Sequence, residues 1–165
     1  MQKILILGNS GSGKSTLALR LSGRAGLAHL DLDTLAWAPV EPPQRRARAE
    51  SLSAMDQFFA NHQDWVVEGC YADLLEYATA RCTRLIFLNP GIEACIENCK
   101  SRPWEPHKYP TPEVQDKNLE FLLGWVRAYE TRRDEFSLAS HRRLFAVFQG
   151  EKIEITSRAA GELTG

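Results

Sequence analysis

Residues 3–21 read KILILGNSGSGKSTLALRL, and this stretch decides the fold. An apolar run (3–7) comes directly before a glycine-rich loop (8–15), and a segment with helical period begins at Lys14. The loop matches the pattern G-x-x-x-x-G-K-[ST], in which glycines allow backbone N–H groups to surround a phosphate. The stretch therefore predicts a strand–loop–helix unit that binds a nucleoside triphosphate, with ATP and Mg²⁺ as the expected ligands.

Each position of this loop has an expected role. Lys14 is a candidate catalytic residue because its charge neutralises the β- and γ-phosphates, and the Ser15 hydroxyl is a candidate Mg²⁺ ligand. The helix that follows presents its positive dipole end to the phosphates. The residues expected to contact the nucleotide are Gly8, Asn9, Ser10, Gly11, Ser12, Gly13, Lys14, Ser15 and Thr16.

Strands and helices alternate through the rest of the chain. Further apolar runs predict buried strands at 28–32, 64–69, 84–89 and 152–156. Segments of helical period separate the runs, at 14–24, 44–61, 71–80, 91–100 and, as more than one helix, from about 112 to 149. Such alternation predicts an α/β fold whose parallel sheet is covered on both faces. The length of 165 residues fits a single domain.

Composition excludes some classes of function. The formal net charge of −1 gives no support to a nucleic-acid partner, although one stays open, and none to an anionic membrane. No apolar run approaches the roughly 18 residues of a membrane-spanning helix, so we expect a cytoplasmic protein. The sequence leaves monomer and homodimer as alternatives.

Carboxylates follow the second and third predicted strands. Asp31 and Asp33 flank Leu32, and alternate strand residues face the same way, so we expect both acids to project together at the sheet edge. Glu68 closes the next strand. Phosphotransfer needs carboxylates to hold Mg²⁺ or its waters and to orient the acceptor hydroxyl. Asp31 and Glu68 are therefore candidate metal ligands and Asp33 a candidate catalytic residue, with a turn or N-cap role for Asp33 as the alternative.

Two proline-containing segments carry cations that could reach such a site. The acceptor-binding region is expected at about 34–63, and a mobile lid at about 100–115. Among the lid cations Arg102 is the preferred catalytic candidate, because a lid can clamp the charge that spreads over the transferring phosphoryl group. In the first of these segments (38–48), Arg45, Arg46 and Arg48 could bind an acceptor phosphate or nucleic acid. The alternative, which we favour, is an i,i+4 helix pair of Arg46 with Glu50.

Taken together, these motifs resemble those of small P-loop kinases of the adenylate-kinase and shikimate-kinase type. More narrowly, the chain resembles bacterial DNA topology modulation (adenylate-kinase-like) P-loop proteins. The likeness rests on residues 4–21, HLDLDTLAW (29–37), WVVEGCY (65–71), LIFLNP (85–90) and EKIEITSR (151–158).

The resemblance implies a three-layer α/β/α sandwich with a five-stranded parallel sheet in the order 2-3-1-4-5 and a small lid. It also implies that Asp31 and Asp33 serve Mg²⁺ and acceptor binding, and that Ser157 and Arg158 lie near the adenine. The adenylate-kinase acceptor signature D-G-F-P-R is replaced by E-G-C-Y at 68–71, which argues against AMP as the acceptor.

Two classes of function follow from these expectations. The first is an Mg·ATP-dependent phosphotransferase that acts on a small hydroxyl-bearing or nucleotide-like acceptor. The second is an ATP-binding, slowly hydrolysing regulator that acts on a nucleic-acid or protein partner. Turnover that depends on an added acceptor favours the first, and salt-dependent binding to nucleic acid favours the second.

Overall fold

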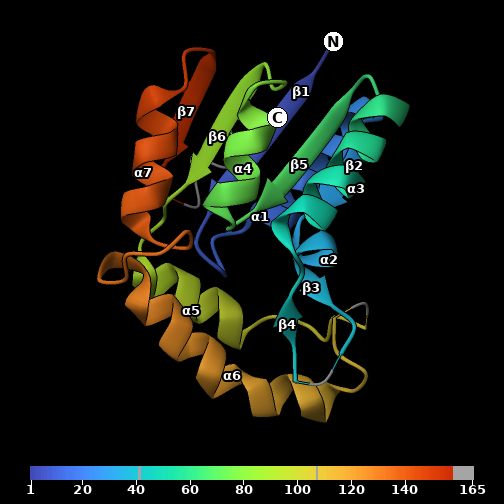
Figure 1. Cartoon of the computed structure of the whole chain (residues 1–165). Helices are drawn as coiled ribbons and strands as arrows, with labels where there is room; N and C mark the ends of the chain where they lie inside the picture. The colour runs from blue at the N-terminus through green and yellow to red at the C-terminus, as the bar shows by residue number, and fades with distance from the viewer. Residues whose placement is uncertain (41, 107, 158–165) are drawn as a thin grey trace.

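The computed structural model describes residues 1–40, 42–106 and 108–157, and its centre is a five-stranded parallel sheet (Figure 1). The strands lie in the order β2-β5-β1-β6-β7, so β5 and β6, the third and fourth strands of the sheet in chain order, flank β1 as the order 2-3-1-4-5 requires. The predicted fold class and strand order are confirmed. The strands are β1 (Lys3–Gly8), β2 (Ala28–Asp31), β5 (Trp65–Gly69), β6 (Arg84–Leu88) and β7 (Glu151–Ile155).

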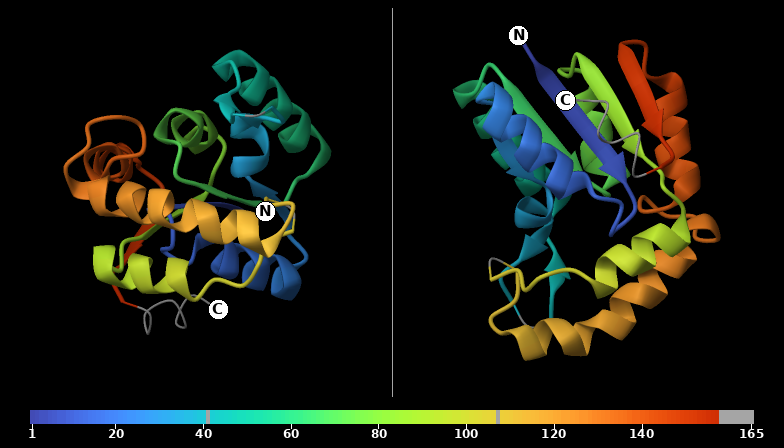
Figure 2. Two further views of the ribbon diagram at one scale, coloured as in Figure 1. Left: turned by 90° about the horizontal axis from the view of Figure 1, so that it is seen from below. Right: turned by 180° about the vertical axis from the view of Figure 1, so that it is seen from behind.

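Helices cover both faces of the sheet. Because successive strand residues point to opposite faces, Leu5 and Leu7 pack with α3, α4 and α7, whereas Ile4 and Ile6 pack with α1. Figure 1 shows α3, α4 and α7 in front of the sheet, and the view from behind in Figure 2 shows α1 on the other face. Their bounds are α1 (Lys14–Ala25), α3 (Arg48–Asn61), α4 (Ala72–Thr79) and α7 (Leu138–Val147).

Two further helices lie beyond the carboxyl ends of the strands (Figure 1). Helices α5 (Ile92–Lys100) and α6 (Pro112–Arg127) pack on each other through a small apolar cluster of their own, and the 3₁₀ helix η1 (Ala128–Glu130) follows. The predicted helical region from 112 to 149 is thus α6, η1 and α7, as expected for more than one helix. The segment that joins α5 to α6 crosses toward the carboxyl end of β2 (Figure 2).

The helix predicted at 44–61 begins later, at Arg48. Gln44–Arg45 instead form β4, which pairs antiparallel with β3 (Trp37–Ala38). Arg46 therefore lies before the helix, and its Nε donates to the carbonyl oxygen of Trp37 at 3.0 Å. The expected Arg46–Glu50 helix pair is wrong for this reason. A short helix, α2 (Asp33–Ala36), precedes this ribbon. Within the described ranges, every helix is too short or too polar to cross a membrane.

Candidate active site

The phosphate-binding loop joins β1 to α1 and lines a cavity of about 650 Å³. Its backbone enters the left-handed region at Gly11 (φ +76°) and Gly13 (φ +96°), which favours glycine at both positions. A Cβ atom on Gly11 would also lie 2.3 Å from the carbonyl oxygen of Cys95 in α5. The loop thus takes its shape from glycine and from close contact with α5.

The loop offers donors that fit a phosphate group. Residues 10–16 line the cavity, whereas Gly8 and Asn9 are buried. Lys14 Nζ donates to the carbonyl oxygen of Asn9 at 2.8 Å. Ser12 Oγ is buried and has no hydrogen-bond partner among the described residues. This hydroxyl, together with the N–H groups that the first turn of a helix leaves unpaired, matches the needs of an anion at the start of α1.

Three carboxylates converge beside the loop. Asp31 ends β2 and is paired directly with Glu68 of β5 in the sheet register. Asp33 is not part of the strand but begins α2, and its backbone N–H donates to Asp31 Oδ1 at 2.9 Å. The prediction that strand alternation brings Asp31 and Asp33 together is therefore wrong in its reason. A turn at Leu32 brings them together instead.

Glu68 connects the acids to the phosphate-binding loop. Its Oε1 accepts a hydrogen bond from Ser15 Oγ at 2.7 Å, and His29 Nε2 lies 3.6 Å away. Burial alone would raise the pKa of Glu68, but His29, Lys14 and Ser15 outweigh burial and hold the pKa below its usual value. Glu68 is thus an ionised carboxylate in contact with the hydroxyl that the motif assigns to Mg²⁺.

The pKa values of the two aspartates are shifted in opposite directions. Burial raises the pKa of Asp31, and the negative charges of Asp33 and Glu68 raise it further. Burial also acts to raise the pKa of Asp33, but Lys108 and the hydrogen bond from Tyr71 outweigh it, so the net pKa is lowered. Neighbouring acids with divergent pKa values are a mark of functional sites.

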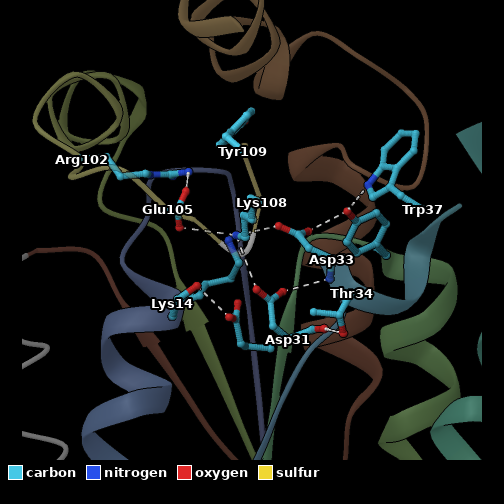
Figure 3. A network of polar contacts seen from close by, with 12 residues as sticks. Lys14, Asp31, Asp33, Thr34, Trp37, Arg102, Glu105, Lys108 and Tyr109 are labelled. Atoms are coloured by element: carbon cyan, nitrogen blue, oxygen red, sulfur yellow. Dashed lines mark hydrogen bonds and ion pairs between the residues drawn. The ribbon is translucent and has the colours of Figure 1, made fainter. Parts of the chain in front are cut away.

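Asp33 has a different partner on each oxygen. Tyr71 donates its hydroxyl to Oδ1 at 2.6 Å, and Lys108 Nζ lies 2.9 Å from Oδ2. The Tyr71 hydroxyl in turn accepts from Trp37 Nε1 at 2.7 Å. Lys108 also lies 3.4 Å from Asp31 Oδ2, and Figure 3 shows its side chain pointing between the two aspartates.

Arg102, the preferred lid cation from the sequence, lines the cavity but has another partner. Its Nη1 lies 3.0 Å from Glu105 Oε2, within the same segment. Figure 3 shows Arg102 directed at Glu105, whereas Lys108 is directed at the aspartates. Among the described residues between α5 and α6, Lys108 is the one whose side chain reaches Asp31 and Asp33.

The residues that could hold a metal fit Mg²⁺ bound together with phosphates. Within residues 1–40, 42–106 and 108–157, no group of three or more His, Cys, Asp or Glu side chains forms a metal cage on its own. Mg²⁺ usually takes one or two carboxylates, with phosphate oxygens and waters completing its shell. Ser15 with Glu68, and Asp31 nearby, supply such a partial set.

The residues expected near the adenine are only partly described. Ser157 lines the cavity together with Pro90 and Ile155, beside the phosphate-binding loop. Arg158 lies outside the described residues. Ser157 follows β7 and Asp33 follows β2, and these two strands form opposite edges of the sheet. Ser157 is thus on the side of the cavity away from Asp33.

Known structures share this fold at low sequence identity. A gluconokinase from Sinorhizobium meliloti 1021 has a TM-score of 0.54 and 18% identity, over 96% of this chain and 85% of that one. A shikimate kinase from Acinetobacter baumannii, in complex with shikimate, has a TM-score of 0.53 and 16% identity over 99% and 89% of the two chains. A deoxyadenosine kinase from M. mycoides with bound dATP has a TM-score of 0.52 and 13% identity over 99% and 97%.

This chain has the fold of small P-loop kinases. No protein-family model matches it, and no curated protein matches it in sequence. The similar structures named above include no DNA topology modulation protein, so that closer resemblance stays a prediction.

Sequence reasoning missed two partners of Asp33. Lys108 was visible as one of several lid cations, but nothing in the local sequence tells which cation crosses to β2. Tyr71 follows the third sheet strand, and nothing in the local sequence tells that its hydroxyl meets Asp33. The structure shows that the Tyr71 ring packs, since the residue is 3% exposed and contacts Phe136 edge-on with ring centroids 5.3 Å apart.

Proposed function

We propose that this protein is an ATP-dependent phosphotransferase that moves the γ-phosphoryl group of ATP, with Mg²⁺, to a small hydroxyl-bearing or nucleotide-like acceptor. The observation that carries this proposal is that Asp33 lines the same cavity as Lys14 and the phosphate-binding loop. The Asp33 carboxylate, which follows β2, and the phosphate-binding loop, which follows β1, therefore face the same cavity. Proteins of the same fold, a gluconokinase and a shikimate kinase among them, support this class of reaction.

The phosphate-binding loop would hold the triphosphate. Lys14 would leave the Asn9 carbonyl to contact the β- and γ-phosphates, and the N-terminus of α1 would favour their negative charge. Ser15, Glu68 and Asp31 would hold Mg²⁺ directly or through waters. The ion supplies charge neutralisation on the phosphate oxygens during transfer.

Asp33 would orient the acceptor and take its proton. The acceptor oxygen forms a bond to the γ-phosphorus while the bond from that phosphorus to the β–γ bridging oxygen breaks, and ADP leaves. The proton of the acceptor hydroxyl passes to Asp33 and then to solvent. A low pKa keeps Asp33 ionised at neutral pH, which is the form that accepts a hydrogen bond from the hydroxyl.

The proposal also covers the acceptor-binding region, the lid, the adenine contacts and the state of the protein in the cell. The chain would act as a single domain, with the acceptor bound by residues 34–63 and covered by the lid segment, residues 100–115. Arg102 would close from the lid once it leaves Glu105, and Ser157 with Arg158 would lie near the adenine. We place the protein in the cytoplasm, as a monomer or homodimer.

A screen of acceptors tests the proposal. Purified protein is supplied with Mg·ATP and with pools of nucleosides, nucleotides, sugars and small alcohols, and ADP release is followed. Asp33→Asn is the test variant, and Asp116→Asn, an exposed site on α6, is the matched control. We expect one pool to raise ADP release, and Asp33→Asn to lower that increment about 10²–10⁴-fold, the usual contribution of a general base.

The opposite result points to the regulatory alternative. Slow ADP release that no pool changes, and that Asp33→Asn leaves intact, would contradict the phosphotransferase. Binding of the protein to nucleic acid would then be measured against salt concentration.

A further inference from the structure

The lid segment is held in shape partly by hydrogen bonds that do not involve the aspartates. The Gln115 side chain accepts from the Glu105 N–H at 2.9 Å and donates to the Pro103 carbonyl at 3.1 Å. Trp104 Nε1 donates to the carbonyl oxygen of Tyr109 at 3.0 Å. The two Gln115 bonds tie the loop to the first turn of α6, and the Trp104 bond joins two parts of the loop itself.

The lid segment contacts the acids through Lys108. Its ammonium group lies 2.9 Å from Asp33, 3.4 Å from Asp31 and 3.6 Å from Glu105 of its own segment. The Lys108 side chain is 19% exposed and the Asp33 side chain 37% exposed, so this contact is partly shielded from solvent. Charged contacts shielded in this way are stronger than surface pairs, and losing one leaves the partner acids uncompensated.

Of the two partners of Asp33, only the lysine is free to withdraw. Tyr71 is packed in the core and its hydroxyl is also held by Trp37. Lys108 has a flexible four-carbon stem, and its ammonium group can leave Asp33 without disturbing the core. An acceptor hydroxyl that approaches Asp33 Oδ2 must therefore displace Lys108 or share the oxygen with it.

This arrangement discriminates between an acceptor and water. A multi-atom acceptor can offset the loss of the Lys108 contact by its own contacts with the cavity, whereas a single water molecule cannot. Enzymes that use substrate binding to drive such a rearrangement gain specificity. Resting on the function proposed above, we propose that Lys108 is a positioning residue that closes the lid on Asp33 and thereby favours phosphoryl transfer to the acceptor over transfer to water.

Kinetics and lid exchange together test this role. Lys108→Met is compared with Lys108→Arg and with Lys117→Met, an exposed lysine on α6, in the full-length protein. We expect Lys108→Met to raise acceptor-independent ATP hydrolysis and to lower the ratio of acceptor-dependent transfer to hydrolysis about tenfold or more. Lys108→Arg should restore part of the ratio, and Lys117→Met should leave both rates unchanged.

Hydrogen–deuterium exchange of the nucleotide-free protein gives a readout without activity. Lys108→Met should increase exchange in the lid segment, while α4 and α7 keep their protection. A variant with unchanged lid exchange, or one in which transfer and hydrolysis fall in parallel, would overturn the proposal.

The two proposals fail in different ways. If no acceptor stimulates the unmodified protein, the phosphotransferase fails, but the lid contact is still tested by exchange and by the hydrolysis rate. If the unmodified protein transfers phosphoryl groups and Lys108→Met does so with the same ratio to hydrolysis, only the role of Lys108 fails.

Discussion

Asp33 receives its two hydrogen-bonding partners from distant parts of the chain. Tyr71 follows β5, and Lys108 comes from the lid segment. Tyr71 also accepts from Trp37, so the hydroxyl links the aromatic side chain at the start of β3 to the carboxylate. The position of Asp33 therefore depends on a buried relay whose removal should affect stability as well as catalysis.

Tyr71→Phe tests the relay. The change leaves Trp37 Nε1 without its acceptor and Asp33 Oδ1 without its donor, so we expect the free energy of unfolding to fall by about 1–2 kcal/mol. The matched control is Tyr77→Phe, whose hydroxyl donates to exposed Asp56 at 2.7 Å and whose loss should cost less than about 0.5 kcal/mol. Urea unfolding measures both, and equal losses would contradict a buried relay.

At this scale the sequence predicts the kinds of groups better than their partners. The loop motif identifies Lys14 and Ser15 because each position has a fixed task on a phosphate. Asp33 is identified from its place after a strand, yet its contact with Lys108 depends on how a distant segment folds across the sheet edge. Pairings of this kind are long-range and leave no local pattern.

At the scale of elements, the phosphate-binding loop depends on its packing against α5. Asn98 Nδ2 donates to the carbonyl oxygen of Gly11 at 2.7 Å, and a Cβ atom on the same glycine would clash with the Cys95 carbonyl oxygen. Helix α5 therefore acts as a support for the loop rather than only as a cover.

Gly11→Ala tests this support. The added Cβ would meet the Cys95 carbonyl oxygen at 2.3 Å, and φ is +76°, so the loop must shift. We expect the Kd for ADP, measured by calorimetry, to rise about tenfold or more, which corresponds to about 1.4 kcal/mol. Gly23→Ala is the control, because a Cβ there meets nothing within 4 Å and alanine favours the α1 helix. ADP binding that is equal in both variants would contradict the account.

The sequence did not predict the β3–β4 ribbon because its strands are too short to show a pattern. Each strand has two residues, so neither shows an alternating pattern. The arginines at 45, 46 and 48 also have helical propensity, which made the segment read as the start of α3. Pairing with Trp37–Ala38 overrides that propensity.

At the scale of the whole molecule, α7 is fixed to the end of β5 by a buried histidine. His141 Nε2 lies 2.9 Å from the Cys70 carbonyl, and Nδ1 lies 2.8 Å from the Tyr129 hydroxyl. Burial lowers the pKa of His141 from its usual 6.5 to about 4. The neutral imidazole therefore connects the helical layer to the strand that carries Glu68.

The pKa of His141 predicts how stability depends on pH. Because the folded pKa is below the unfolded one, the unfolded state binds the proton more readily, and stability falls as pH drops from about 7 toward 4. We expect this group to cost about 2 kcal/mol between pH 7 and pH 5. Unfolding of His141→Gln should lack that part of the pH dependence, while the carboxyl groups common to both proteins contribute equally.

An NMR titration of His141 in the unmodified protein checks the same point without a variant. A pKa close to 6.5 would contradict the buried neutral histidine, as would an unchanged pH dependence of stability in His141→Gln.

The fold as a whole was predictable because the same sequence pattern, a strand segment followed by a helical segment, recurs along the chain. Five strand segments alternate with helical segments, and burial on both faces makes β1, β5 and β6 nearly continuous apolar runs. The prediction of buried strands is wrong for the edge strands: β2 is partly buried and most of β7 is exposed. The strand order was implied by resemblance, since local patterns do not specify which strands are neighbours. The crossing of the lid segment toward Asp33 was expected only in outline, because a loop carries few periodic constraints.

The destination of the γ-phosphoryl group is the most direct test of the central claim. The protein is incubated with Mg·ATP and the acceptor pool that raises ADP release, and the products are followed by ³¹P NMR, with Asp33→Asn alongside. The account predicts a new phosphomonoester signal that grows with ADP in the unmodified protein and is lost in Asp33→Asn, which still binds ADP. Inorganic phosphate as the sole product, at a rate that neither the acceptor nor Asp33→Asn changes, would contradict it.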